Sequence, residues 1–191
     1  RQNLNPVRIE FGPFLEANVA LLENAAGDAQ LELAVAPGVP ALLADRSGLV
    51  TALINLVANA RHAVEARSIG SAGDGLTGNT AIGHIRIAAH PVEVVGADEH
   101  WPLLPPGTYV AVAVEDNGCG MSAGVLAQAV EPFFTTRLPG EGSGLGLSMV
   151  QGFARQTGGD LRLQSEAGKG TTVTLLLPSI NSILAPCSNL H

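Results

Sequence analysis

The chain has 191 residues, of which 46% are hydrophobic, and 10 basic and 17 acidic side chains give it a net charge of −7. The length suits one domain with a real core, and the acidic balance argues against nucleic-acid binding, which needs Lys and Arg to neutralise phosphates. No apolar run approaches the roughly 20 residues needed to cross a bilayer. We therefore expect a cytoplasmic domain without membrane contact.

Three further features bear on organisation and compartment. The chain begins at Arg1 in a polar stretch without a signal-peptide pattern, so we expect an internal fragment. Residues 1–11 are assigned to a linker, 12–178 to one domain and 179–191, which lack periodicity, to a tail. The cysteines, Cys119 and Cys187, lie in unrelated contexts, which argues against a disulfide framework or cysteine zinc site and favours a reducing compartment.

Periodicity and turn residues predict the elements in chain order. Helices are expected at 12–27, 45–67, 122–130 and 144–157, and extended segments at 31–37, 41–45, 84–95, 108–116, 161–166 and 171–177. A Gly/Ser/Thr-rich loop is expected at 69–83 and a Gly-rich segment at 139–146. Since helices and strands do not alternate as in a doubly wound sheet, this order predicts an α/β two-layer sandwich with a mixed sheet.

The helix expected after Asp45 has two different faces. One carries Val50, Leu53, Val57 and Val64 and should bury against the sheet. The other carries Gly48, Ala52, Asn55, Asn59, His62 and Ala66. Small residues allow close approach, and amide oxygens suit Mg²⁺ held alongside substrate phosphates. Alternatively, both asparagines satisfy backbone groups of a neighbouring loop.

A strand ending in Asp116 runs into Asn117-Gly118-Cys119-Gly120-Met121. This places a carboxylate at the sheet's end, where it can accept a hydrogen bond from an exocyclic amine, and lets the backbone turn tightly around a flat ligand. Met121 suits packing on an aromatic ring. The alternative is an ordinary Asx turn between strand and helix.

A second glycine cluster, GEGSGLGLS at 140–148, opens a helix. Backbone amides at a helix N-terminus form a phosphate site. The spacing matches neither the dinucleotide-binding fingerprint nor the P-loop. The alternative is a flexible linker.

Together these segments resemble the boxes of two-component sensor histidine kinases. NLVANARHA (55–63) resembles the N box, VEDNGCGM (114–121) the G1 box, EPFFTTR (131–137) the F box and GEGSGLGLSMV (140–150) the G2 box. The closing GGDLRLQSEAGKGTTVTLLLP (158–178) is similar to the family's terminal strands. The resemblance implies the Bergerat ATP-binding fold, shared with DNA gyrase, and the cofactors ATP and Mg²⁺.

The resemblance also implies roles by position. Asp116 would bind the adenine amine, and Asn59 would coordinate Mg²⁺ with support from Asn55. Phosphate contacts are candidates for His62, with a satisfied surface histidine as the alternative, and for Arg137, where relatives often carry Lys. The remaining nucleotide-binding candidates are Gly118, Gly120, Met121, Gly142, Ser143, Gly144, Leu145, Gly146, Leu147 and Thr171. Residues 122–143 would form a flexible ATP lid, fastened by burial of Phe133 and Phe134.

Asn55 distinguishes kinase from hydrolase. Hydrolysing relatives place a water-activating glutamate there, and an amide cannot accept a proton at neutral pH, so we predict transfer to a protein histidine. The family's acceptor histidine lies on a dimerisation helix before an acidic residue, but His62, His84, His90, His100 and His191 are followed by Ala, Ile, Pro, Trp and nothing. We therefore predict that the acceptor domain is absent and that this fragment does not phosphorylate itself.

Two other functions stay open. One is a serine-directed or gyrase-like ATPase on the same fold, and the other is a non-catalytic nucleotide-binding module. The expected partners of the kinase are its own dimerisation domain and a response-regulator receiver domain. The sequences of the G1 and F boxes resemble those of hybrid kinases. In a hybrid kinase, a receiver domain would follow residue 191.

Overall fold

The computed structural model describes residues 5–71, 82–95, 101–137 and 142–181. Its helices are α1 (Phe11–Ala26), α2 (Arg46–Ser71), α3 (Ala123–Gln128) and α4 (Gly146–Gln156). Its strands are β1 (Pro6–Ile9), β2 (Gln30–Val35), β3 (Leu42–Asp45), β4 (His84–Val94), β5 (Gly107–Asp116), β6 (Asp160–Glu166) and β7 (Gly170–Pro178). Each predicted helix and extended segment is confirmed to within a few residues, and β1 is additional.

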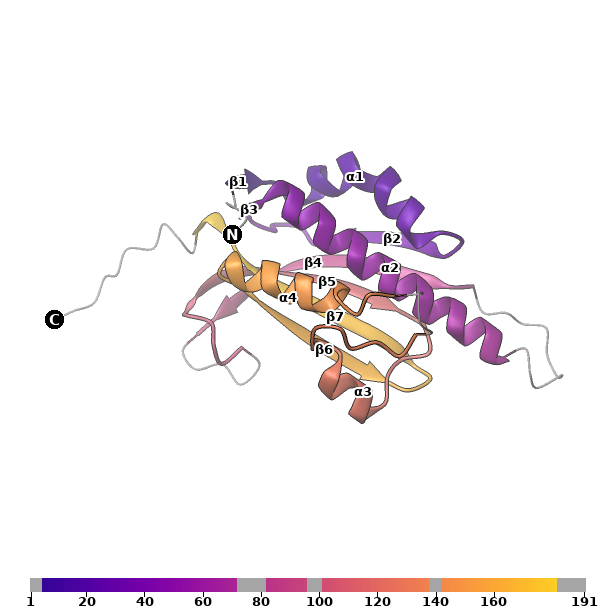
Figure 1. Cartoon of the computed structure of the whole chain (residues 1–191). Coiled ribbons are helices and arrows are strands. Elements are labelled where there is room, and N and C mark those ends of the chain that lie inside the picture. The colour runs from indigo at the N-terminus through magenta and orange to yellow at the C-terminus, as the bar shows by residue number, and fades with distance from the viewer. Residues whose placement is uncertain (1–4, 72–81, 96–100, 138–141, 182–191) are drawn as a thin grey trace.

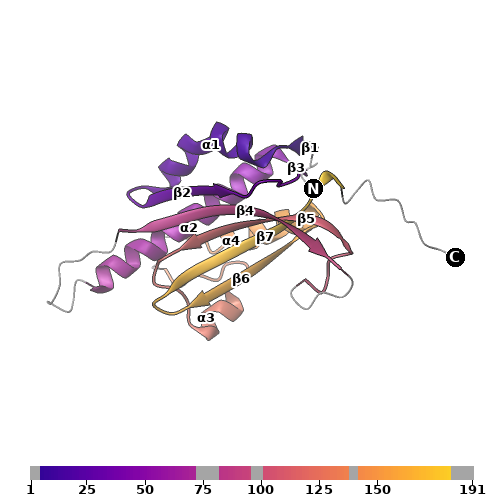
Figure 2. The same ribbon diagram turned by 180° about the vertical axis from the view of Figure 1, so that it is seen from behind.

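Five strands form a sheet in the order β2-β4-β5-β7-β6. β2 pairs with β4 in parallel, and the other neighbours pair antiparallel. Helices α1, α2 and α4 cover one face of this sheet, which we call the inner face, as the two opposite views show (Figures 1 and 2). The predicted two-layer sandwich with a mixed sheet is therefore confirmed.

The main core lies between the inner face and the helices. Alternation along β5 and β7 points one set of side chains to the helices, namely Val110, Val112, Val114, Val173, Leu175 and Leu177. From α2, the predicted apolar face joins this core: Leu53 and Val57 are buried in it, and the half-buried Val50 packs against it. Val64 is also buried, outside this cluster. Helix α2 is thus fixed along the sheet by its hydrophobic side chains.

The small-residue face of α2 is not uniformly open. Ala52 is only 3% exposed, contrary to its predicted place opposite the core. Helix α4 packs on this side of α2: a Cβ added to Gly48 would lie 2.7 Å from the ring of Phe153. Small residues therefore admit another helix near the start of α2, and the asparagines follow farther along.

The outer face of the sheet carries a second, smaller core. Trp101 and Leu104, from the Pro-rich connection between β4 and β5, pack there with Val94, Tyr109, Ala111 and Leu176. The Tyr109 hydroxyl donates to the Pro105 carbonyl at 2.9 Å. The connection is thus part of the packed structure at these residues.

Strand β1 lies in the segment that the sequence assigned to a linker. It pairs antiparallel with β3, and Ile9 is 1% exposed within the main core. Four residues in a polar stretch give no detectable periodicity, so only the partner strand reveals this pairing.

At the other end, Ser179 is buried and its amide donates to the Thr108 carbonyl at 3.1 Å. Within the described residues, no helix has the length and hydrophobicity of a membrane span.

We predict that Leu53→Ala lowers the free energy of unfolding by about 2–5 kcal/mol, because it leaves a cavity in the main core. The matched control is Leu21→Ala on α1, since Leu21 is 51% exposed and its truncation should change stability by less than about 0.5 kcal/mol. Urea unfolding measures both. Similar losses in the two variants would contradict the assignment of α2 as the core helix.

Candidate functional site

The inner face of the sheet ends in a short polar row. Asp116 lies on the same face of β5 as Val112 and Val114, because alternate residues of a strand share a face. Thr171 of β7 is its cross-strand partner, and Ser165 of β6 is the partner of Thr171. Beyond the apolar core, the same face therefore presents a carboxylate and hydroxyl groups.

Asp116 is held by backbone donors from both sides. Its Oδ1 accepts from the Gly118 amide at 2.8 Å and from the Thr171 amide at 3.3 Å. Burial raises the pKa of Asp116, and the two hydrogen bonds partly oppose that rise. The carboxylate is thus oriented by the backbone and is poorly hydrated, so it gains from a ligand that donates to it.

Ser165 joins this site, although it was not among the predicted residues. Its hydroxyl donates to the Gly170 carbonyl at 3.0 Å, accepts from the Met121 amide at 2.8 Å and lies 2.9 Å from Thr171 Oγ1. Alternation in LRLQSE places it on the face of Leu161 and Leu163, so a polar residue ending that apolar row was the available signal. The half-buried Met121 is positioned through it.

The glycines after Asp116 are required by close packing within the protein. A Cβ on Gly118 would lie 2.5 Å from the backbone carbon of Ala63 in α2, and the Cys119 amide donates to the Ala63 carbonyl at 2.9 Å. Gly120 has a φ of 64° and its Cβ would lie 2.0 Å from the Glu166 carbonyl oxygen. This loop is therefore held between α2 and the β6–β7 hairpin.

The two asparagines of α2 meet the start of α4. A Cβ on Gly146 would lie 3.5 Å from Asn59 Nδ2 and 3.6 Å from Asn55 Oδ1. Asn55 also donates from Nδ2 to the Thr51 carbonyl of its own helix at 2.9 Å. The N-box and G2-box segments thus converge in space, as their resemblance implied.

Arg137 binds the asparagine expected to hold the metal. Its Nη2 donates to Asn59 Oδ1 at 2.8 Å, and its Cδ would lie 3.1 Å from a Cβ on Gly142. No sequence pattern indicated this pair, because the two residues are 78 positions apart. The guanidinium therefore lies at the oxygen that a cation would use.

His62 is oriented by its own helix. Its Nδ1 lies 2.5 Å from the Ala58 carbonyl oxygen, so Nδ1 carries the proton and Nε2 is left for other contacts. The half-buried ring shares the face of Asn55 and Asn59 by spacing.

The expectation that Phe133 is buried is wrong. Its side chain is 75% exposed, and its φ of 67° is unusual for a residue other than glycine. Its amide donates to the Gly144 carbonyl at 2.9 Å, and a Cβ on Gly144 would lie 2.5 Å from the carbonyl carbon of Phe133. Phe134 is half-buried. Part of the expected lid, 138–141, lies outside the described residues, so its flexibility stays a prediction.

Helix α4 begins without a capping side chain at Leu145. The Ser143 hydroxyl accepts from the Leu145 amide at 3.3 Å, upstream of the first turn. The half-buried Leu147 side chain packs against the main core, so its backbone amide is the group that it offers to an anion. The first-turn amides of α4 therefore suit an anion.

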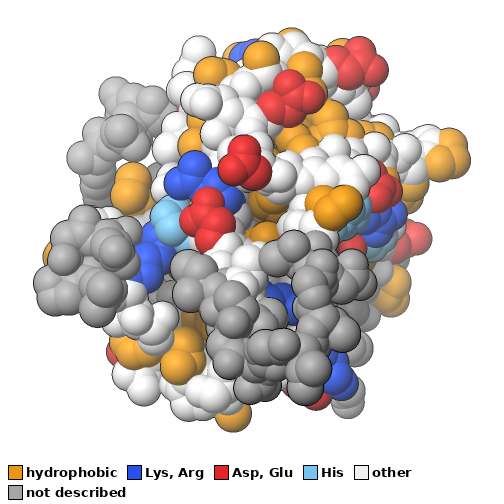
Figure 3. All heavy atoms as spheres, turned by 90° about the vertical axis from the view of Figure 1, so that its right-hand side faces the viewer, with side chains coloured by type: hydrophobic (Ala, Val, Ile, Leu, Met, Phe, Trp, Pro, Cys, Tyr) orange, Lys and Arg blue, Asp and Glu red, His pale blue; other side chains and the backbone are white. Residues whose placement is uncertain are grey.

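An open hollow of about 350 Å³ borders this region, lined by Asp116, Gln164, Ser165, Glu166, Lys169, Gly170, Thr171 and Thr172. Figure 3 views the end of the molecule at which α2 and β5 finish, and there basic, acidic and histidine side chains are interspersed. The polar row thus opens onto a surface of mixed charge.

The fold agrees with comparisons to known proteins. The model of the histidine kinase-, DNA gyrase B- and HSP90-like ATPases matches residues 44–181, and the chain belongs to this family of ATP-binding domains. It is 35% identical over 182 residues to the sensor kinase CckA of Brucella abortus, covering 94% of the chain and 18% of that protein. It is 33% identical over 135 residues to the histidine-protein kinase AtoS of Escherichia coli, covering 71% of the chain and 17% of that protein.

Solved structures share the fold. The mycobacterial sensor histidine kinase MprB superposes with a TM-score of 0.62 at 22% identity, covering 93% of this chain and 99% of that one. Full-length ShkA in complex with AMPPNP superposes with a TM-score of 0.63 at 24% identity, covering 95% of this chain and 32% of that one. The resemblance to histidine kinases is confirmed, while the chain spans only 17–18% of the length of the relatives named above.

Asp116→Asn should raise the stability of the nucleotide-free domain at neutral pH. Because burial raises the pKa of Asp116, the group favours folding while it is protonated, and this contribution is lost as the pH rises through the raised pKa. The variant keeps an amide oxygen for both backbone donors and carries no charge. Its gain should shrink as the pH falls through the pKa of Asp116, as measured by urea unfolding from about pH 4 to about pH 8.

Asp45→Asn is the matched control with the opposite sign. Hydrogen bonds from the Gly48 amide and the Ser47 hydroxyl lower the pKa of Asp45, so its contribution is present above the unfolded pKa and lost as the pH falls through the folded one. This variant should be less stable than the parent at neutral pH. Destabilisation by both substitutions would contradict the burial of Asp116.

Proposed function

We propose that this domain binds Mg·ATP and transfers the γ-phosphate to a histidine on a separate dimerisation domain in two-component signalling. The observation that carries the proposal is the contact of the loop after β5 with α2 at Ala63. It sets Asp116 and Asn59 at one end of the inner face, beside the start of α4. The contact thus supports the proposed grouping of a carboxylate for the purine, an amide for the metal and backbone amides for the phosphates.

Asp116 is the proposed adenine ligand. Both of its recorded backbone donors reach Oδ1, which leaves Oδ2 to accept from the exocyclic amine. A hydrogen bond to a charged acceptor contributes on the order of 1.5–3 kcal/mol. Met121 would pack on the ring, and Gly118, Gly120 and Thr171 would border it.

The residues present fit Mg²⁺ held jointly with a substrate. Asn59 offers a hard amide oxygen, and among the described residues no cluster of three or more His, Cys, Asp or Glu could form an all-protein site. Mg²⁺ is usually bound by few protein oxygens plus substrate phosphates. When bound, the ion neutralises charge on the phosphates, while Asn55 supports Asn59 from the preceding turn.

The amides of Gly142, Ser143, Gly144, Leu145, Gly146 and Leu147 are the proposed phosphate cradle. Gly146 lies against both asparagines, so a phosphate bound at the amides of α4 would lie near the proposed metal ligand. The helix dipole of α4 adds to this attraction.

Asn55 favours transfer over hydrolysis. Its amide cannot take a proton from water, and its Nδ2 is committed to the Thr51 carbonyl. Phosphoryl transfer relies on positioning and charge neutralisation. The acceptor imidazole nitrogen forms a bond to the γ-phosphorus while the bond to the ADP oxygen breaks. A response-regulator receiver would then take the phosphoryl group.

We predict that the isolated chain with Mg·ATP incorporates no phosphate, and that adding a separately made dimerisation domain yields acid-labile phosphohistidine on that domain. Asp116→Asn should abolish ATP binding. Asn59→Ala should end transfer but leave adenosine binding unchanged, because it removes only the metal ligand. Phosphate incorporated into the isolated chain would contradict the predicted lack of an acceptor in this chain. Sustained hydrolysis without an acceptor would favour the ATPase alternative.

Arg137 is proposed to change partners during binding. A guanidinium and a divalent cation repel each other at one oxygen, so Asn59 must exchange Arg137 for the metal. The released guanidinium is then free to contact a phosphate. His62, on the same face of α2 as Asn59, is a second proposed phosphate contact.

Arg137→Ala should therefore slow phosphoryl transfer at least about tenfold, because a cation on the transferring group is lost. Adenosine, which has no phosphate, should bind as before. Arg155→Ala on α4 is the control, since the Arg155 side chain is 56% exposed and pairs with Asp160. Unchanged transfer by Arg137→Ala would remove Arg137 from the proposed site.

A further inference from the structure

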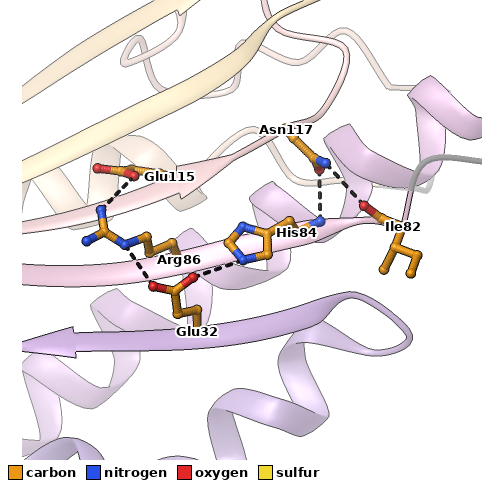
Figure 4. A network of polar contacts seen from close by, with 6 residues as sticks. All are labelled: Glu32, Ile82, His84, Arg86, Glu115 and Asn117. Atoms are coloured by element: carbon orange, nitrogen blue, oxygen red, sulfur yellow. Dashed lines mark hydrogen bonds and ion pairs between the residues drawn. The ribbon is translucent and has the colours of Figure 1, made fainter.

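Asn117, directly after Asp116, uses each of its polar groups in a hydrogen bond. Its Oδ1 accepts from the His84 amide at 2.8 Å, and its Nδ2 donates to the Ile82 carbonyl at 3.1 Å, as Figure 4 shows. Its own amide donates to the His84 carbonyl at 3.2 Å. Its carbonyl accepts from the Arg67 guanidinium. A residue with such partners fixes the chain where it leaves β5.

These partners belong to separate elements. Ile82 lies just before β4 and His84 is its first residue. Arg67 lies on α2, about two turns beyond Asn59. Asn117 therefore joins the end of β5 both to its neighbouring strand and to the helix that carries the proposed metal ligand.

The start of β4 is itself held from the outer face. His84 Nε2 lies 3.1 Å from Glu32 Oε2, and Glu32 also pairs with Arg86, which reaches Glu115 at 3.3 Å (Figure 4). The backbone groups that Asn117 binds are thus part of a cross-strand network. Asn117 extends this network to the inner end of the sheet.

The carboxylate of Asp116 depends on this arrangement. Its closest donor is the Gly118 amide, on the far side of Asn117. Gly118 has no side chain with which to anchor itself, and it must also lie against Ala63. A shift of Asn117 would therefore move the donor and the carboxylate relative to α2.

We propose that Asn117 is a positioning residue that sets base selectivity by holding Asp116 in register with α2; this inference rests on the proposed function. Adenine presents an amine to the carboxylate, whereas guanine presents a carbonyl oxygen at the corresponding position, which the carboxylate repels. Discrimination between adenine and guanine therefore depends on the position of the Asp116 carboxylate. The ratio of the ATP affinity to the GTP affinity measures this discrimination.

The test compares the affinities of Mg·ATP and Mg·GTP by calorimetry. The parent should prefer ATP, and Asn117→Ala should weaken ATP and lower the ATP:GTP ratio by at least about tenfold, with GTP little changed. Partial unfolding reduces both affinities by the same factor, so the ratio is insensitive to it. Asn18→Ala is the matched control, because Asn18 also donates to a backbone carbonyl, that of Phe14 at 2.7 Å, on α1. It should keep the parent ratio.

Asn117→Asp keeps the acceptor for the His84 amide and loses the donor to Ile82, so it should give an intermediate ratio. Both nucleotides carry the same triphosphate, so repulsion of phosphates by the added charge cancels in the ratio. An unchanged ratio in Asn117→Ala, or parallel loss of both nucleotides in both variants, would overturn the role of Asn117. A parent that binds ATP and GTP equally would instead refute adenine recognition by Asp116.

Discussion

The site depends on one backbone contact, between the loop after β5 and α2. Gly118 lies against the backbone of Ala63, and the Cys119 amide donates to the Ala63 carbonyl. Ala63 is about one helical turn beyond Asn59, and Gly118 is two residues beyond Asp116. No flexible side chain lies between the two backbones at this contact. The helix and the end of the sheet therefore hold the Asp116 carboxylate and the Asn59 amide at a fixed separation. A larger residue at 118 would force them apart.

Several residues of the proposed site depart from the usual burial, composition or backbone conformation of their residue type or element. Asp116 is buried enough to raise its pKa, α2 replaces apolar and charged side chains with small residues and amides, and Phe133 adopts a positive φ while exposed. These departures lie in the segments that carry the proposed site residues, whereas the apolar rows of β5, β7 and α2 form a regular core. The regular part of the fold thus stabilises the irregular part that forms the proposed site.

Periodicity was sufficient to predict the helices, the sheet class and the buried face of α2, because these follow from hydrophobic spacing. The family resemblance implied that Asn59 and the start of α4 serve one nucleotide site, and the structure brings these two segments together. The Arg137–Asn59 pair, the exposure of Phe133 and the burial of Ala52 were not predictable, since each depends on side chains from distant segments. Strand β1 was too short to show a pattern. Ser165 could have been found from alternation in β6.

The central claim is that a purine binds at Asp116 while Asn59 holds the metal that binds its phosphates. A crystal structure of the chain with Mg²⁺ and a non-hydrolysable ATP analogue tests it most directly. The account predicts the adenine amine against the Asp116 carboxylate, the metal on Asn59 Oδ1 and Arg137 released from that oxygen. A nucleotide seated elsewhere, or a metal bound without Asn59, would contradict it.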